Sequence, residues 1–270
     1  MAVPMLHHAL WARTRQFGLI GRYAVQQFRL ARRGEAFPLA LLHDRAWFAL
    51  GDKRLPTISL EVLFPGITAL PVCVQSVTPQ LPGNLTAEAL CVVALLCQRL
   101  QPRALFEFGT FNGRTTLNLA LNTPAEARIY TLDLPSPGQT VLPTASGDGQ
   151  FQLGLQSGAL WKGSPAAAKI EQVWADSAHF DEQPYRDRMD LVFVDAAHSY
   201  EYVRNDSGKA LSMVRRGGII VWDDYCAWYP GVVRHLHEIA ERWPVHHLEG
   251  THLAILIVPK DPPQELPSRT

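Results

Sequence analysis

The sequence predicts an α/β protein with a doubly wound, mostly parallel sheet of the Rossmann-like type. Between residues 86 and 258, short apolar runs alternate with amphipathic, helix-like stretches, which is the pattern of repeated βαβ units. The run at 189–194 is almost continuously apolar, as expected of a central strand that is buried on both faces of a parallel sheet. Together these observations favour a layered α/β domain.

The expected elements follow in chain order. Apolar runs predict strands at 104–108, 128–132, 170–175, 189–194 and 219–222, and a terminal hairpin of 245–248 with 253–258. Helical periodicity predicts helices at 86–100, 115–121, 199–215 and 230–242. Thr86 and Glu88 suit the start of the first of these helices. Gly217 and Gly218 are expected to end the third.

Composition and patterning divide the 270 residues into three parts. With 47% apolar and 19% charged residues, the chain can bury one large core beside an appendage. We expect a basic helix and an irregular extension over residues 1–85, a cofactor-binding domain over 86–258 and a loose tail over 259–270. Residues 135–165 are rich in Gly, Ser and Pro yet contain several large apolar side chains. They are predicted to form a lid or substrate-binding insertion.

Charge is balanced overall but unevenly distributed. Residues 1–60 carry six more basic than acidic side chains, and the remainder carries six more acidic than basic ones. The helix predicted at 5–33 could therefore contact a partner or a membrane surface. The body lacks the basic stripe that nucleic acid requires. No run is long enough to span a membrane, no signal peptide is apparent and the cysteines show no C-x-x-C pairing. We expect a cytoplasmic homo-oligomer with buried free thiols.

Residues 104–133 carry the main functional motif, which reads strand, glycine turn, helix, strand and acid. Gly109 and Gly113 allow a tight turn and a close approach to a ligand. Asp133 ends the second strand, where a carboxylate can bind ribose hydroxyls. A dinucleotide site would read G-x-G-x-x-G, whereas here Glu107 precedes the glycines. That acid favours a ligand with an ammonium group and no phosphate.

Aspartates follow the remaining predicted strands as well. Each could serve individually as a helix cap. As a set, however, they meet at the carboxyl edge of the sheet, where ligands of such folds bind. The set comprises Asp133, Asp176, Asp195, Asp223 and Asp224.

The Glu107-x-Gly109-x-x-x-Gly113 motif closely resembles the first motif of class I S-adenosyl-L-methionine (SAM)-dependent methyltransferases, and the resemblance covers about residues 86–258. It implies a seven-stranded sheet whose last strand is antiparallel. It also implies that Glu107, Gly109 and Gly113 hold the methionine end of SAM. In the same way it assigns the ribose to Asp133 and the adenine amino group to Asp176. The neighbouring Asn112 and Ser177 complete the expected cofactor site.

The stretches 194–203 and 217–224 resemble the branch with metal-dependent small-molecule O-methyltransferases, such as the catechol and macrolide-sugar enzymes. The resemblance implies that Asp195, Asp223 and Asp224 bind a divalent cation such as Mg²⁺. The acid pair is Asp-Asp here, Asp-Asn in the catechol type and His-Asp in many relatives. The sequence therefore leaves open whether a metal binds. His198 and Asp195 are the expected catalytic residues, with His198 as the general base.

The expected activity is SAM-dependent methyl transfer to a hydroxyl of a small molecule, a sugar or secondary metabolite, with possible Mg²⁺ assistance. One alternative is a metal-independent methyltransferase that uses the His198 base alone. Another is a dinucleotide-binding oxidoreductase, which the glycine spacing disfavours. A catalytically silent partner protein with the same fold and a nucleic-acid methyltransferase complete the alternatives.

Overall fold

The computed structural model describes residues 54–78 and 80–260, and the predicted basic helix at 5–33 therefore lies outside the described residues. The chain divides into two compact units, one of residues 1–54 and 226–228 and the other of residues 55–225 and 229–270. The second unit contains every element described below. No helix within the described ranges is both long and apolar enough to cross a membrane.

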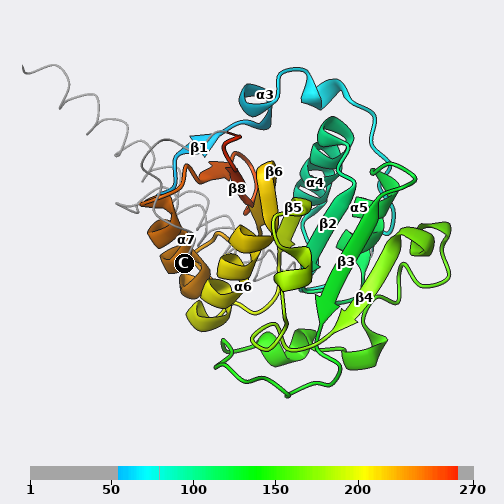
Figure 1. Cartoon of the computed structure of the whole chain (residues 1–270), viewed down its shortest axis with the longest axis vertical. Coiled ribbons are helices and arrows are strands. Elements are labelled where there is room, and N and C mark those ends of the chain that lie inside the picture. Colours follow the sequence, from blue (N-terminus) through cyan, green and yellow to red (C-terminus); the bar gives the residue numbers. More distant parts are fainter. Residues whose placement is uncertain (1–53, 79, 261–270) are drawn as a thin grey trace, which may run out of the picture. The chain divides into compact units, whose positions relative to one another are not determined.

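The described strands form one eight-stranded sheet, in the order β1-β7-β8-β6-β5-β2-β3-β4 (Figure 1). The strands are β1 (Thr57–Ile58), β2 (Ala104–Phe108), β3 (Arg128–Asp133), β4 (Ile170–Trp174), β5 (Met189–Val194), β6 (Val214–Trp222), β7 (His246–Leu248) and β8 (Ala254–Ile257). All pairings are parallel except those of β8 with β6 and with β7. The predicted Rossmann-like sheet with an antiparallel last strand is confirmed.

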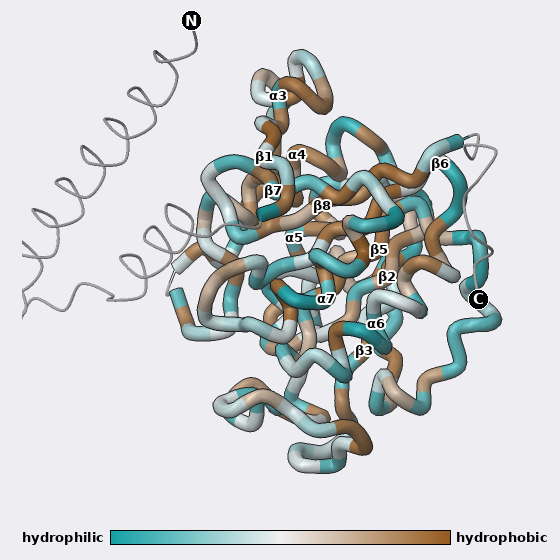
Figure 2. The backbone as a smooth tube through the Cα atoms, turned by 90° about the vertical axis from the view of Figure 1, so that its left-hand side faces the viewer, coloured by the Kyte–Doolittle hydropathy of each residue, from teal (hydrophilic) through white to brown (hydrophobic). Residues whose placement is uncertain are grey.

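Helices cover the sheet, and hydrophobic residues run along the central strands (Figures 1 and 2). The α-helices are α3 (Leu60–Leu63), α4 (Ala87–Leu100), α5 (Arg114–Leu121), α6 (Tyr200–Met213) and α7 (Pro230–Ala240). Leu105, Ile129 and Phe193 pack with α4 and α5 in one buried cluster. The neighbouring helices α6 and α7 contact each other, and α6 contacts β5 and β6. Thr86 caps α4 as predicted, since its side chain accepts a hydrogen bond from the N–H of Ala89.

Two parts of the fold differ from the prediction. The eighth strand, β1, lies in a region that the sequence marked as irregular, because two residues are too few for any periodic signal. The glycine pair does not end a helix, since α6 stops at Met213 and β6 already begins at Val214. Gly217 has φ +74° where the pairing with β5 shifts register, so the pair belongs to a β-bulge within the strand.

The cysteines are free, as predicted, but they are not all buried. Cys97 lies in the core beneath α4, whereas Cys73 is exposed in the extended chain that precedes α4. The local sequence around Cys73 is apolar, and apolar neighbours alone do not bury a residue in an irregular segment.

Candidate functional site

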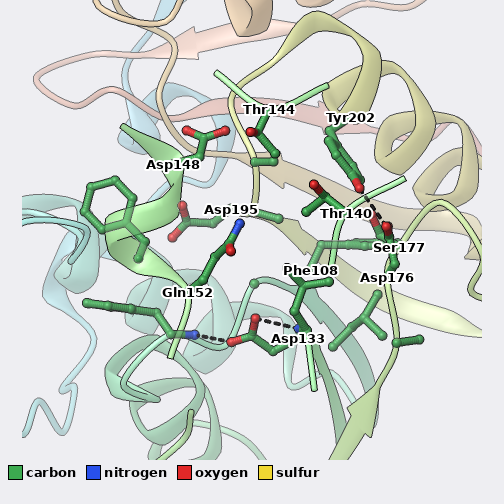
Figure 3. A pocket seen from close by; sticks show the side chains of 18 residues that line it. Phe108, Asp133, Thr140, Thr144, Asp148, Gln152, Asp176, Ser177, Asp195 and Tyr202 are labelled. Atoms are coloured by element: carbon green, nitrogen blue, oxygen red, sulfur yellow. Dashed lines mark hydrogen bonds between the residues drawn. The ribbon is translucent and has the colours of Figure 1, made fainter. Parts of the chain in front are cut away.

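The carboxyl ends of β2, β3, β4 and β5 surround one cavity, with about 670 Å³ of space not filled by atoms, its mouth included (Figure 3). A ligand site at this edge is expected for a parallel sheet. Several predicted residues meet there: Gly109, Asp133, Asp176, Ser177 and Asp195.

Asp133 is placed by the backbone around it. Its Oδ2 accepts a hydrogen bond from the N–H of Phe111 at 3.0 Å, and its Oδ1 accepts one from the N–H of Leu134 at 2.8 Å (Figure 3). Burial raises the pKa of the carboxyl group above its usual range. Each carboxylate oxygen can accept a further hydrogen bond, so Asp133 can also bind a ligand in the cavity.

Gly109 lets the loop after β2 pass the end of β5. Its φ is +91°, and a Cβ atom at this position would lie only 1.8 Å from the backbone oxygen of Asp195. Any side chain here would separate the two strand ends. The glycine therefore brings the loop of Phe111 and the strand end of Asp195 together at the cavity.

Glu107 does not line the cavity. It points to the α5 side of the sheet, where the hydroxyls of Thr116 and Thr131 both donate to its Oε2 at 2.5 Å. The side chain is fully buried, its Oε1 has no hydrogen-bond partner among the described residues, and burial raises its pKa to about 7. The expected contact between Glu107 and the methionine end of SAM stays a prediction.

Gly113 and Asn112 are covered by the 135–165 segment. A Cβ at Gly113 would lie 2.5 Å from Cδ1 of Trp161 and 2.7 Å from the Cα of Gly158. The N–H of Leu160 donates to the carbonyl of Asn112 at 3.0 Å. Neither residue lines the cavity. Gly113 is therefore needed for the close packing of this turn against Trp161 and Gly158, which the motif alone did not reveal.

Asp176 lines the cavity just beyond the carboxyl end of β4, where it contacts the 135–165 segment. Its Oδ2 accepts a hydrogen bond from the hydroxyl of Tyr202 at 2.7 Å (Figure 3) and another from the N–H of Val141 at 2.8 Å. Its Oδ1 accepts one from the N–H of Ala178 at 2.8 Å. Asp176 therefore closes the cavity and also retains capacity to accept a hydrogen bond from a ligand.

The three acids expected to bind a metal do come together. One carboxylate oxygen from each of Asp195, Asp223 and Asp224 lies within 4.8 Å of the others. Burial and the neighbouring carboxylates raise the pKa of Asp223 to about 7 and that of Asp195 well above its usual range. Crowded carboxylates resist ionisation unless a cation compensates them. A hard divalent cation therefore fits this set of oxygen donors.

His198 joins this acid cluster from the loop before α6. Its Nε2 lies 2.7 Å from Oδ2 of Asp224 and its Nδ1 lies 2.6 Å from Oδ1 of Asp148. Burial alone would lower its pKa, but the two carboxylates outweigh burial and raise it to about 10. A histidine that holds protons on both nitrogens cannot accept another. In this arrangement the structure does not support His198 as the general base.

Several cavity residues were missed from the sequence. They come from the 135–165 segment and from α6: Thr140, Thr144, Asp148, Phe151, Gln152 and Tyr202. Asp148 is the only acid within residues 135–165, and that singularity is the one signal that could have identified it. The segment contains only short turns such as Asp148–Phe151, so no periodicity predicted which side chains face the cavity.

The fold agrees with the predicted resemblance to class I methyltransferases, and so does the comparison with protein families. Residues 106–225 match the family model described as a methyltransferase domain. This match confirms the predicted resemblance to class I SAM-dependent methyltransferases. No curated protein sequence matches the chain.

Solved structures resemble the chain at low sequence identity. The SAH-bound methyltransferase PaMTH1 from Podospora anserina is 16% identical with a TM-score of 0.51, over 67% of this chain and 83% of that one. The SAM-bound O-methyltransferase TomG from Streptomyces achromogenes, involved in tomaymycin synthesis, is 23% identical with a TM-score of 0.49, over 66% and 83%. A putative O-methyltransferase from Klebsiella pneumoniae is 16% identical with a TM-score of 0.48, over 82% and 97%.

Proposed function

We propose that this protein transfers the methyl group of SAM to a hydroxyl of a small molecule, a sugar or secondary metabolite. The observation that carries the proposal is the charge of the cavity. Four carboxylates line it, those of Asp133, Asp148, Asp176 and Asp195, and none of its described lining residues has a basic side chain. A ligand with positive charge and ribose hydroxyls suits such a lining, and SAM combines a sulfonium, an ammonium group and a nucleoside.

The same lining disfavours the oxidoreductase alternative. A nicotinamide dinucleotide carries a pyrophosphate, which binds at helix N-termini and glycine-rich turns and avoids carboxylates. Here the turn before α5 is covered by Trp161 and Gly158. The cavity therefore offers a pyrophosphate neither an open turn nor a cation.

We further propose that Asp195, Asp223 and Asp224 hold a divalent cation, with Mg²⁺ as the first choice because the donors are all oxygens. When bound, such a cation lowers the pKa of an acceptor hydroxyl and orients it. The alternative is a metal-independent reaction. The contact between His198 and Asp224 favours it, because a protonated imidazole already compensates one acid of the cluster.

Within this site the protein aligns the reactants and removes a proton. Gly109 and Asp133 shape the cofactor side of the cavity, and Asp195 lines the same cavity from the end of β5. In the metal-independent reaction, the raised pKa of Asp195 makes its carboxylate a stronger base than an ordinary aspartate. For that reaction we assign removal of the hydroxyl proton to Asp195, with His198 as its charged neighbour.

Ligand-induced stabilisation tests the proposed function. SAM and its demethylated product SAH should raise the melting temperature, because each binds only the folded state, whereas NADH should not. Stabilisation by NADH but not by SAH would reject the methyltransferase proposal. Incubation of small-molecule extracts with the protein and isotope-labelled SAM, followed by mass spectrometry, would then identify the acceptor. Activity that persists in EDTA would favour the metal-independent reaction.

A further inference from the structure

Asp148 makes an unusual set of contacts for a residue in an irregular segment. Its Oδ1 lies 2.6 Å from Nδ1 of His198. Its Oδ2 accepts hydrogen bonds from the backbone N–H of His198 at 3.2 Å and of Ala145 at 2.9 Å. The side chain is only 6% exposed. One carboxylate thus holds both the ring and the backbone of a residue that is fifty positions away in the sequence.

The other side of the same ring faces the acid cluster. Nε2 of His198 lies 2.7 Å from Oδ2 of Asp224. The ring also stacks on Tyr229, with 3.9 Å between ring centroids and 16° between planes. Because an imidazole is rigid, the position of Nδ1 and the stacking plane together determine where Nε2 points. A continuous path therefore runs from Asp148 through His198 to Asp224.

Asp148 also belongs to the segment that covers the cavity. The 135–165 segment contributes Thr140, Thr144 and Phe151 to the cavity lining along with Asp148. The same segment is attached at Asp176 through the N–H of Val141. It is attached near the glycine turn through the N–H of Gly158, which donates to the carbonyl of Phe111 at 2.8 Å. The contact with His198 is its link to the acid cluster.

We propose that Asp148 is a positioning residue that holds His198 against Asp224 and thereby couples the order of the 135–165 segment to the assembly of the acid cluster. The Asp148 side chain then serves two purposes. It helps to close the 135–165 segment over a bound cofactor, and it orients the reaction centre. The inference rests on the proposed function, because the cofactor and the reaction centre are those proposed above. If Asp148 only anchored the segment, its loss would leave the His198 ring unaffected.

Nuclear magnetic resonance of the histidine rings tests this inference with the full chain, both free and with SAH. The ring N–H signals of His198 are assigned by their absence in His198→Gln. They should exchange slowly with water in the wild type and at least roughly tenfold faster in Asp148→Ala. Asp148→Glu should restore part of the protection because it keeps the carboxylate. Gln150→Ala, an exposed change in the same turn, should match the wild type. Unchanged His198 signals in Asp148→Ala would overturn the inference.

Once the extract experiment has identified the acceptor, steady-state kinetics provide a second test. Asp148→Ala should lower kcat roughly 10- to 100-fold, a larger factor than the rise in the KM for SAM, because three of the four cavity carboxylates remain. The double variant Asp148→Ala/His198→Ala should be no slower than His198→Ala, since Asp148 acts through the ring. Additive losses would show that Asp148 acts by another route. Failure of the wild type to bind SAH would reject the proposed function, and the ring signals of the ligand-free protein would still decide the role of Asp148.

Discussion

At the scale of single residues, the site shows which roles a sequence motif can predict. Asp133, Asp176 and Asp195 could be placed at the cavity because each follows an apolar strand, and strand ends meet at one edge. Asp148 could not, because only the fold of an irregular segment brings it to His198. Glu107 was expected at the cavity, but alternation along β2 turns its side chain towards α5.

Asp133→Asn should weaken SAH binding by roughly 10- to 100-fold. The substitution removes the charge that strengthens hydrogen bonds to ribose hydroxyls, and it points an amide N–H at one of two backbone donors, Phe111 or Leu134. Titration calorimetry measures the change. Glu126→Gln is a matched control, because Glu126 is exposed and precedes β3 at the opposite end of the strand. Equal affinities in the wild type and Asp133→Asn would remove Asp133 from the cofactor site.

Asp195→Asn should stabilise the ligand-free protein while it abolishes turnover. The substitution removes the cost of burying a charge and the repulsion from Asp223 and Asp224, which together raise the pKa of Asp195, so the melting temperature should rise. The variant should also lose any rise in melting temperature that Mg²⁺ gives the wild type. Thermal unfolding with and without Mg²⁺, together with a methyl-transfer assay, measures both effects. Retained activity would show that Asp195 is neither the base nor a metal ligand.

At the scale of elements, periodicity predicted the long, regular helices and strands. It failed where backbone geometry determines the structure, as at a bulge or in an irregular segment. The strands β2 and β5 were predicted within their observed bounds because their residues are almost all apolar. The start of β6 was missed because Arg215, Arg216 and the two glycines interrupt its apolar run at a bulge. The fold of the 135–165 segment was beyond prediction because its attachments are single hydrogen bonds to distant residues.

Gly109→Ala tests how the β2 and β5 ends are joined. The new Cβ would lie 1.8 Å from the backbone oxygen of Asp195, and alanine would have to adopt φ +91°. We expect a loss of roughly 3 kcal/mol or more in the free energy of unfolding. Gly138→Ala is the control, because Gly138 also has positive φ but open space around it, and about 1 kcal/mol is expected. Equal losses in chemical denaturation would show that the close approach to Asp195 is unimportant.

At the scale of the whole molecule, the buried acids make stability depend on pH. Burial raises the pKa of Glu107 and of Asp223 to about 7, from 4.5 and 3.8. Between those values the folded protein keeps protons that the unfolded chain has released, so the free energy of unfolding falls as pH rises. His198 continues this trend above neutral pH, since its pKa is about 10 in the folded protein and 6.5 in the unfolded chain. The ligand-free protein is therefore expected to lose stability steadily from mildly acidic to mildly alkaline pH.

Chemical denaturation at about pH 5.5, 7 and 8.5 measures this dependence. The unfolding midpoint should fall across the series, and Glu107→Gln should flatten the part of the slope below neutral pH, because a buried amide has no charge to suppress. Mg²⁺ should restore stability mainly at the alkaline end, where the acids of the cluster are ionised and can bind it. A midpoint that rises with pH would mean that these carboxylates are solvated rather than buried, and the acid-lined cavity would lose the electrostatic character that selects a cationic cofactor.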